Sequence, residues 1–158
     1  MKTTGKQLIA ATALALIGFS TAANAQTFYM NENRDIKRGT EAMKQGDLEG
    51  ASRYFRRAAS RDIGAERLVP VLNNLCAVDY AQGKLDSAEE ACTRAIAEDR
   101  HFWRAYVNRG NVLKAKGHFA QAHQDYAKAV KLKPGSDMTQ RALAKLLEEQ
   151  PKLFAVAR

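Results

Sequence analysis

The sequence predicts an all-α protein built from stacked helical hairpins, and three observations support this class. Small and large apolar residues recur at a spacing of 34 residues, and a fixed period near this length is typical of repeated helical hairpins. Within each predicted helix the recurring positions lie three or four residues apart, which places them on one face of that helix. Glycines and a proline fall where those helices would have to end. The matched pairs are Leu72 with Tyr106, Cys76 with Gly110, Gly83 with Gly117, Leu85 with Phe119, Ala88 with Ala122, Cys92 with Tyr126 and Ala95 with Ala129.

The first 25 residues have the pattern of a cleavable secretory signal of bacterial type. Two lysines give a positive start, residues 8–19 are almost wholly apolar, and Ala23 and Ala25 are the small residues that a signal peptidase reads. The alternative, a membrane anchor, needs an apolar stretch of roughly 20 residues, and this one is shorter. We therefore expect cleavage after Ala25, a periplasmic or secreted protein, and no stable membrane insertion afterwards.

Residues 26–158 have a length that suits one domain. The whole chain has a formal charge of +8, and removal of the signal, with two lysines and no acid, leaves +6. In a cytosolic protein such an excess of positive charge would suggest nucleic acid as a partner. Here the expected export and the scattered placement of the basic residues, without a DNA- or RNA-binding motif, predict no nucleic acid partner. The simplest explanation of the positive charge is a solvated basic surface. The alternative is that this charge attracts an acidic partner or the anionic surface of the envelope.

The unit at residues 103–136 shows the hairpin pattern in full. Gly117 is the stop signal between its two helices, because glycine readily takes the left-handed conformation that ends a helix. Gly110 on the first helix and Ala122 on the second are small, so the two backbones can approach closely at their crossing. Pro134 closes the unit, since proline cannot continue a helix.

Two earlier units follow the same pattern. The second, about residues 69–102, repeats it without a closing proline, and the first, about residues 32–65, matches the second at a spacing of 37. About three residues are therefore inserted between the two units. We expect a longer turn at residues 61–64 to accommodate them.

A single further helix is predicted at residues 137–149. Ser136 and Asp137 offer a side-chain oxygen as N-cap, and Leu143 and Leu147 continue the register of the first helices. No second helix is expected to follow it. A lone helix with one apolar face is typical of the cap that covers the last repeat of a stack.

These residues carry a resemblance to the tetratricopeptide repeat family. Residues 105–134, AYVNRGNVLKAKGHFAQAHQDYAKAVKLKP, combine the small, aromatic and proline positions of that family. The resemblance implies a right-handed superhelix of three hairpins plus the capping helix, in a single domain over residues 26–158. In the first unit, however, Asp35 and Arg38 stand where the family usually has large apolar residues. We expect the first helix of that unit to pack loosely.

By the same resemblance, the first helix of each hairpin lines a concave groove that binds a protein or an extended peptide. Asparagine side chains there can both donate to and accept from a peptide backbone, and the lysines and arginine favour an acidic segment. The alternative for the asparagines, polarity of the helix surface or hydrogen bonding between repeats, stays open. The expected groove residues are Lys44, Asn73, Asn74, Tyr80, Arg104, Asn108, Asn111 and Lys114.

Some members of the family hold a terminal carboxylate with a Lys/Asn/Arg clamp. Asn74 and Arg104 match parts of this clamp. Ile36 and Thr40, however, stand where the lysine and one asparagine would be needed, and Asn108 stands where the arginine would be. We therefore do not predict a carboxylate clamp in this chain.

Reactive groups do not converge in the sequence. His118 and His123 are five residues apart, which places them on different sides of a helix, and no phosphate-binding loop or hydrolase motif occurs. We expect no enzyme activity, no cofactor and no metal. Cys76 and Cys92 lie nearly equidistant from the turn at Gly83, on stripes that face each other. They predict a disulfide in an oxidising compartment, with two buried small hydrophobes as the alternative.

The expected function is that of a non-catalytic scaffold, an adaptor or assembly factor of the cell envelope that binds its partner in the groove. The alternative is a structural protein that self-associates into a homo-oligomer. Asp35 and Arg38 suggest this alternative, because they make the first unit a poor end for the stack.

Overall fold

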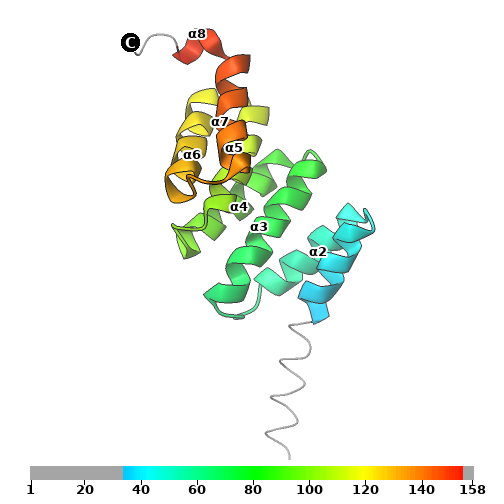
Figure 1. The fold of residues 1–158 in the computed structure, drawn as a ribbon. Helices are drawn as coiled ribbons and strands as arrows, with labels where there is room; N and C mark the ends of the chain where they lie inside the picture. Colours follow the sequence, from blue (N-terminus) through cyan, green and yellow to red (C-terminus); the bar gives the residue numbers. More distant parts are fainter. Residues whose placement is uncertain (1–33, 155–158) are drawn as a thin grey trace, which may run out of the picture.

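The computed structural model describes residues 34–154, in which all the secondary structure is helical. The expected signal segment and its cleavage site lie outside the described residues. Helices follow one another in antiparallel pairs from one end of the molecule to the other (Figure 1). They are a helix at residues 34–44, α2 (Leu48–Ala59), α3 (Ala65–Ala81), α4 (Leu85–Glu98), α5 (Trp103–Ala115), α6 (Phe119–Leu132), α7 (Asp137–Glu149) and α8 (Pro151–Phe154).

The hairpins pack on one another in chain order. The helix at 34–44 and α2 form the first hairpin, α3 and α4 the second, and α5 and α6 the third. Contacts between α2 and α3, between α4 and α5, and between α6 and α7 join each unit to the next, and α3 also contacts α5. This is the all-α solenoid of helical hairpins, closed by a further helix, that the sequence predicts.

A glycine ends the first helix of every hairpin. Gly46, Gly83 and Gly117 have φ angles of 78°, 73° and 80°, a conformation in which a side chain with a Cβ atom is strained. The chain can therefore reverse direction within a few residues and begin the next helix. These turns explain why the two helices of each pair lie antiparallel.

The expected turn at residues 61–64 is present, since residues 60–64 are not helical, but the helix that follows starts earlier than the repeat register suggests. Gly64, with a φ of 74°, is the N-cap of α3, so α3 begins at Ala65 instead of near residue 69. The inserted residues thus add a turn to the helix. Pro70 lies inside α3, where its missing N–H gives up one hydrogen bond to the carbonyl four residues earlier.

The two helices of each outer hairpin cross where an aromatic ring covers a glycine. A Cβ atom on Gly110 would lie 2.5 Å from Cε1 of Tyr126, and one on Gly39 would lie 2.7 Å from Cε1 of Phe55. Both rings are almost fully buried. The ring occupies the space that any side chain larger than that of glycine would need. The thickness of the ring therefore sets how closely the two helices approach.

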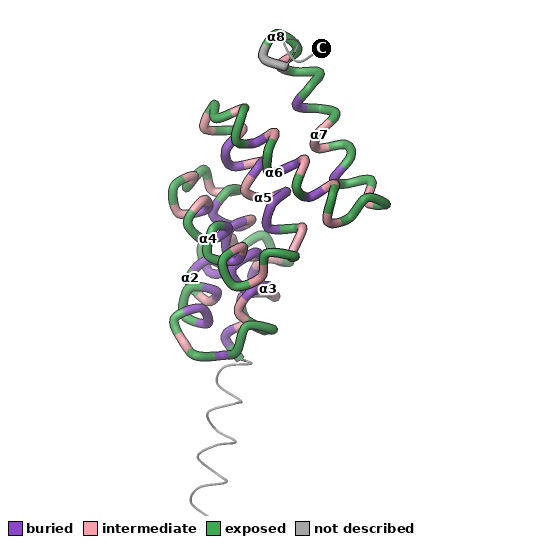
Figure 2. Tube along the Cα trace, turned by 90° about the vertical axis from the view of Figure 1, so that its left-hand side faces the viewer, coloured by how far each residue is buried: buried purple, intermediate pink, exposed green. Residues whose placement is uncertain are grey.

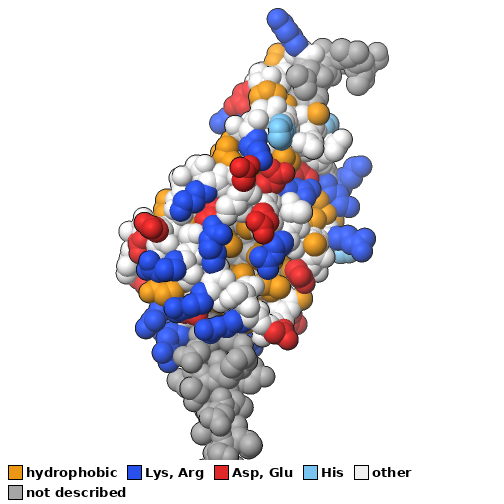
Figure 3. Space-filling model, turned by 180° about the vertical axis from the view of Figure 1, so that it is seen from behind, with side chains coloured by type: hydrophobic (Ala, Val, Ile, Leu, Met, Phe, Trp, Pro, Cys, Tyr) orange, Lys and Arg blue, Asp and Glu red, His pale blue; other side chains and the backbone are white. Residues whose placement is uncertain are grey.

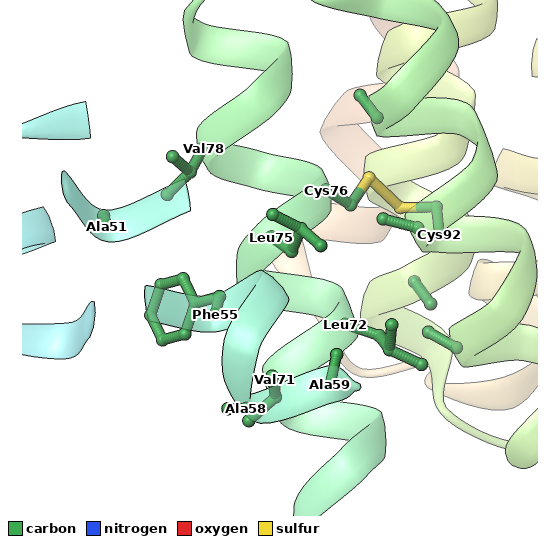
Figure 4. Packing of buried hydrophobic residues seen from close by; sticks show 14 of the residues in the cluster. Ala51, Phe55, Ala58, Ala59, Val71, Leu72, Leu75, Cys76, Val78 and Cys92 are labelled. Atoms are coloured by element: carbon green, nitrogen blue, oxygen red, sulfur yellow. A yellow bond between two sulfur atoms is a disulfide. The ribbon is translucent and has the colours of Figure 1, made fainter. Parts of the chain in front are cut away.

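The central hairpin has a disulfide at the same crossing. Cys76 of α3 and Cys92 of α4 are bonded, with their Cα atoms 5.3 Å apart and both side chains fully buried. Figure 4 shows Leu75 of α3 packed between this bond and Phe55 of α2. The core of the first two hairpins is therefore continuous through the crossing.

Buried residues line the helix faces that turn toward neighbouring helices (Figure 2). At the C-terminal end, Leu146 of α7 is fully buried in a cluster with Leu113 and Tyr126, so α7 covers the third hairpin. The repeat register predicts Leu147 on the covered face of α7, but its side chain is 37% exposed. The short α8, which was not expected, follows α7 directly.

Asp35 corrects the expectation of a loosely packed first helix. Its side chain is only 2% exposed, and Arg57 of α2 donates to both carboxylate oxygens through Nε and Nη2. The hydrogen bond from Arg57 holds the pKa of Asp35 below its usual value despite burial. A buried carboxylate with such a partner does not incur the full cost of desolvation. An ion pair thus replaces the apolar contact at this position.

Reduction of the Cys76–Cys92 bond tests its contribution to the stack. Because the bond constrains the unfolded chain, reduction should lower the free energy of unfolding by up to about 3 kcal/mol. The melting temperature should fall by several degrees, as measured by circular dichroism with and without reductant. Thiol alkylation of denatured, unreduced protein from its native compartment is the control. Two labelled thiols per chain would contradict a bond in the native protein.

Candidate binding groove

The eight expected groove residues lie on helices that occupy equivalent places in the three hairpins. Lys44 is the last residue of the helix at 34–44. Asn73, Asn74 and Tyr80 belong to α3, and the other four belong to α5. Because α3 and α5 are in direct contact, the fold brings these two sets of side chains together. The eight side chains differ in how far they are already bonded to other residues of the chain.

Asn73 and Asn108 bond to each other across the repeat interface. The amide nitrogen Nδ2 of Asn108 donates to Oδ1 of Asn73 at 2.9 Å, and Asn73 is only 8% exposed. A buried amide needs such a partner, since an unpaired one costs about 1–3 kcal/mol. This pair therefore joins α3 to α5, so these two asparagines serve the hydrogen bonding between repeats that is the alternative to ligand binding.

Asn111 holds an aromatic side chain of its own hairpin. Its Oδ1 atom accepts a hydrogen bond of 2.7 Å from the hydroxyl of Tyr126. Burial raises the pKa of Tyr126 above its usual value, so the hydroxyl keeps its proton and remains a donor. Asn111 thus fixes the ring that covers Gly110 at the helix crossing. The sequence pattern identifies the aromatic position but not this bond.

Lys114 already has an acidic partner within the chain. Its Nζ atom lies 2.9 Å from Oε2 of Glu149, at the end of α7, and Lys145 lies 3.8 Å from the other oxygen of that carboxylate. The hydrogen bond from Lys114 holds the pKa of Glu149 below its usual value. The charge that Lys114 was expected to offer to a ligand is therefore countered by the capping helix.

Four of the expected residues remain available to a ligand. Lys44 and Arg104 are exposed, Asn74 is half-buried, and Tyr80 is 38% exposed. Within residues 34–154, no hydrogen bond or ion pair engages the side chains of Lys44, Asn74 or Arg104. The guanidinium of Arg104 lies 4.5 Å from the centre of the Trp103 ring, a cation–π contact that leaves its N–H groups free to bond.

Two further features of the described residues bear on the kind of site. No three His, Cys, Asp or Glu side chains in that part of the chain come together as metal ligands would. None of the described helices combines the length and the apolar character needed to cross a membrane. The candidate groove residues offer hydrogen-bonding groups, one open guanidinium, one ammonium and one aromatic surface, which are groups suited to binding.

The Asn73–Asn108 pair can be assigned to packing or to ligand binding by its effect on stability. Asn108→Ala should lower the free energy of unfolding by about 1 kcal/mol, because it leaves the buried oxygen of Asn73 unpaired. A double-mutant cycle with Asn73→Ala, measured by denaturant unfolding, gives the coupling energy. Arg104→Ala, an exposed change on the same helix, is the control and should stay within about 0.5 kcal/mol. A coupling energy of zero would show that the pair does not hold the repeats together.

Residues 103–136, which form the third hairpin, match the family model of the tetratricopeptide repeat. The chain is 26% identical over 117 residues to sperm-associated antigen 1 of Rattus norvegicus, in an alignment that covers 74% of this chain and 13% of that protein. The matched region is thus a small part of a much longer protein.

Solved structures share the fold over most of the described chain. The first TPR domain of Spaghetti (RPAP3), bound to the HSP90 peptide SRMEEVD, has a TM-score of 0.70 at 22% identity and covers 76% of this chain and 93% of its own. The second TPR domain of human RPAP3, in complex with the HSP70 peptide SGPTIEEVD, has a TM-score of 0.67 at 26% identity and covers 75% and 96%. The repeat match and the shared fold together support the tetratricopeptide repeat family for this chain.

Proposed function

We propose that the chain is a non-catalytic scaffold that binds a peptide or protein partner in the groove lined by its first helices. The observation that carries this proposal is the open set Asn74, Tyr80 and Arg104 on the adjoining helices α3 and α5. The two RPAP3 domains with the same fold are described in complex with peptides. That likeness supports a peptide or protein as the occupant of the groove.

The partner that suits this groove is an acidic or polar segment. It is not a C-terminal carboxylate held by the Lys/Asn/Arg clamp. Lys44 and Arg104 are the open cations, whereas Lys114 is paired with Glu149. Asn108 stands where the clamp needs an arginine and is bonded to Asn73. The HSP90 and HSP70 peptides of the RPAP3 domains are therefore not proposed as partners of this chain.

The proposed place of action is the bacterial cell envelope, where the protein would serve as an adaptor or assembly factor. The N-terminal signal pattern is the main support for export. The Cys76–Cys92 bond is consistent with it, because disulfides persist in oxidising compartments such as the periplasm.

Self-association is the second candidate, and the structure weakens the reason that suggested it. Asp35 was expected to spoil the packing of the first hairpin, but it is buried and paired with Arg57. Arg38 lies 6.0 Å from the centre of the Tyr54 ring. These two residues therefore have partners within the chain, which weakens the argument for self-association that they suggested.

Site-specific photo-crosslinking tests the groove. A photoreactive amino acid is placed at Tyr80 or Arg104 and, as a matched control, at Lys128 or Lys131, which are exposed on α6. In the native envelope, the groove positions should give one discrete adduct and the α6 positions none. Equal adducts from both faces, or none from the groove, would contradict the proposal. An adduct of twice the protein's own mass would establish self-association instead.

A further inference from the structure

Lys and Arg occur along the whole chain, and the first hairpin, at one end of the stack, holds an excess of them over Asp and Glu. Residues 34–61 contain eight Lys and Arg against four Asp and Glu, in a chain whose total formal charge is +8. Figure 3 shows the Lys and Arg side chains gathered at the end of the molecule that holds this first hairpin. A local excess of positive charge raises the concentration of anions near that surface.

The outer surface of the first hairpin has a shallow, open depression between α2 and the start of α4. A depression of about 500 Å³ there is lined by four cations, Arg53, Arg56, Arg57 and Lys84, and by one acid, Glu49. None of these residues belongs to the first helices that form the candidate groove. The depression is thus a second surface feature with its own chemistry.

Two of the four cations are held in place by buried acids. Arg56 donates through Nη2 to the carboxylate of Asp79, which is fully buried, and to the Ser87 hydroxyl at 2.7 Å. Arg57 makes its two-point contact with Asp35. The side chains of Arg56 and Arg57 nevertheless remain 50% and 49% exposed. Guanidinium groups fixed in this way lose little conformational freedom when they bind an oxyanion.

The other two cations supply uncompensated charge. Arg53 lies 5.5 Å from the centre of the Tyr54 ring, and Lys84 donates to Oε1 of Gln82 at 2.8 Å. Neither has an ion-pair partner among the described residues. With Arg56 and Arg57 balanced by their buried acids, Arg53 and Lys84 outweigh Glu49. The surface therefore combines fixed donors with a net positive charge.

We propose that this depression binds a phosphate-bearing ligand. A phosphate group carries up to two charges and three strong acceptor oxygens, so it can engage more than one of the cations that line this depression. A single carboxylate has only two oxygens and one charge, and it would satisfy fewer of these donors. The site goes beyond the proposed groove function, and it shares none of the open groove residues with it.

Titration with inorganic pyrophosphate tests the site in the purified protein at low salt. The variant Arg53→Glu with Lys84→Glu should bind at least tenfold more weakly, because a lost charge-assisted hydrogen bond weakens binding by about that factor. Lys128→Glu with Lys131→Glu makes the same change in net charge on exposed positions of α6 and should change the affinity less than threefold. Circular dichroism checks that both variants keep their helices.

Vesicles distinguish the sources of the phosphate. Sedimentation with phosphatidylglycerol vesicles, against phosphatidylcholine vesicles as control, shows whether a lipid headgroup can fill the site. Loss of vesicle binding in the Arg53/Lys84 variant supports a headgroup, and loss of pyrophosphate binding alone supports a soluble ligand. The proposal is overturned if neither probe binds, if both double variants lose binding equally, or if an acidic peptide without phosphate binds as tightly as pyrophosphate.

Discussion

The close crossing of the two helices in each hairpin is the constraint on which the rest of the structure depends. In the outer hairpins a glycine faces a buried aromatic ring, and in the central hairpin two cysteines are joined at the same place. All three solutions keep the backbones close, so that neighbouring apolar residues pack into one cluster across the first two hairpins and into two smaller clusters at the third. The pairs are Gly39 with Phe55, Cys76 with Cys92, and Gly110 with Tyr126.

This packing separates two surfaces with different chemistry. The first helices lie beside one another, and several of their polar residues are used to join repeats, as Asn73 and Asn108 show. What remains open there is a small set around Tyr80 and Arg104. The second helix of the first hairpin instead carries arginines that are held in place by hydrogen bonds to buried acids. The proposed partner-binding groove and the proposed anion-binding depression therefore share no residue.

The sequence predicts the stacked hairpins well, because a 34-residue register and glycine stop signals are local, periodic features. It predicts polar pairing poorly. Asp35 and Arg57 are 22 residues apart, and Lys114 and Glu149 are 35 apart, so no helix period links them. Periodicity indicates which face is buried, but it does not indicate which charged residue is buried with a partner. For the same reason, only half of the expected groove residues remain open.

The substitution Gly110→Ala tests the crossing most directly. Gly110 lies inside α5, and helix propensity alone would make alanine stabilising there by roughly 0.5–1 kcal/mol. Our account predicts the opposite sign, a loss of about 1–3 kcal/mol in the free energy of unfolding, because the new Cβ atom would overlap the Tyr126 ring. Gly135→Ala, with no atom within 4 Å of its Cβ position, is the control. Equal or greater stability of Gly110→Ala would contradict the account.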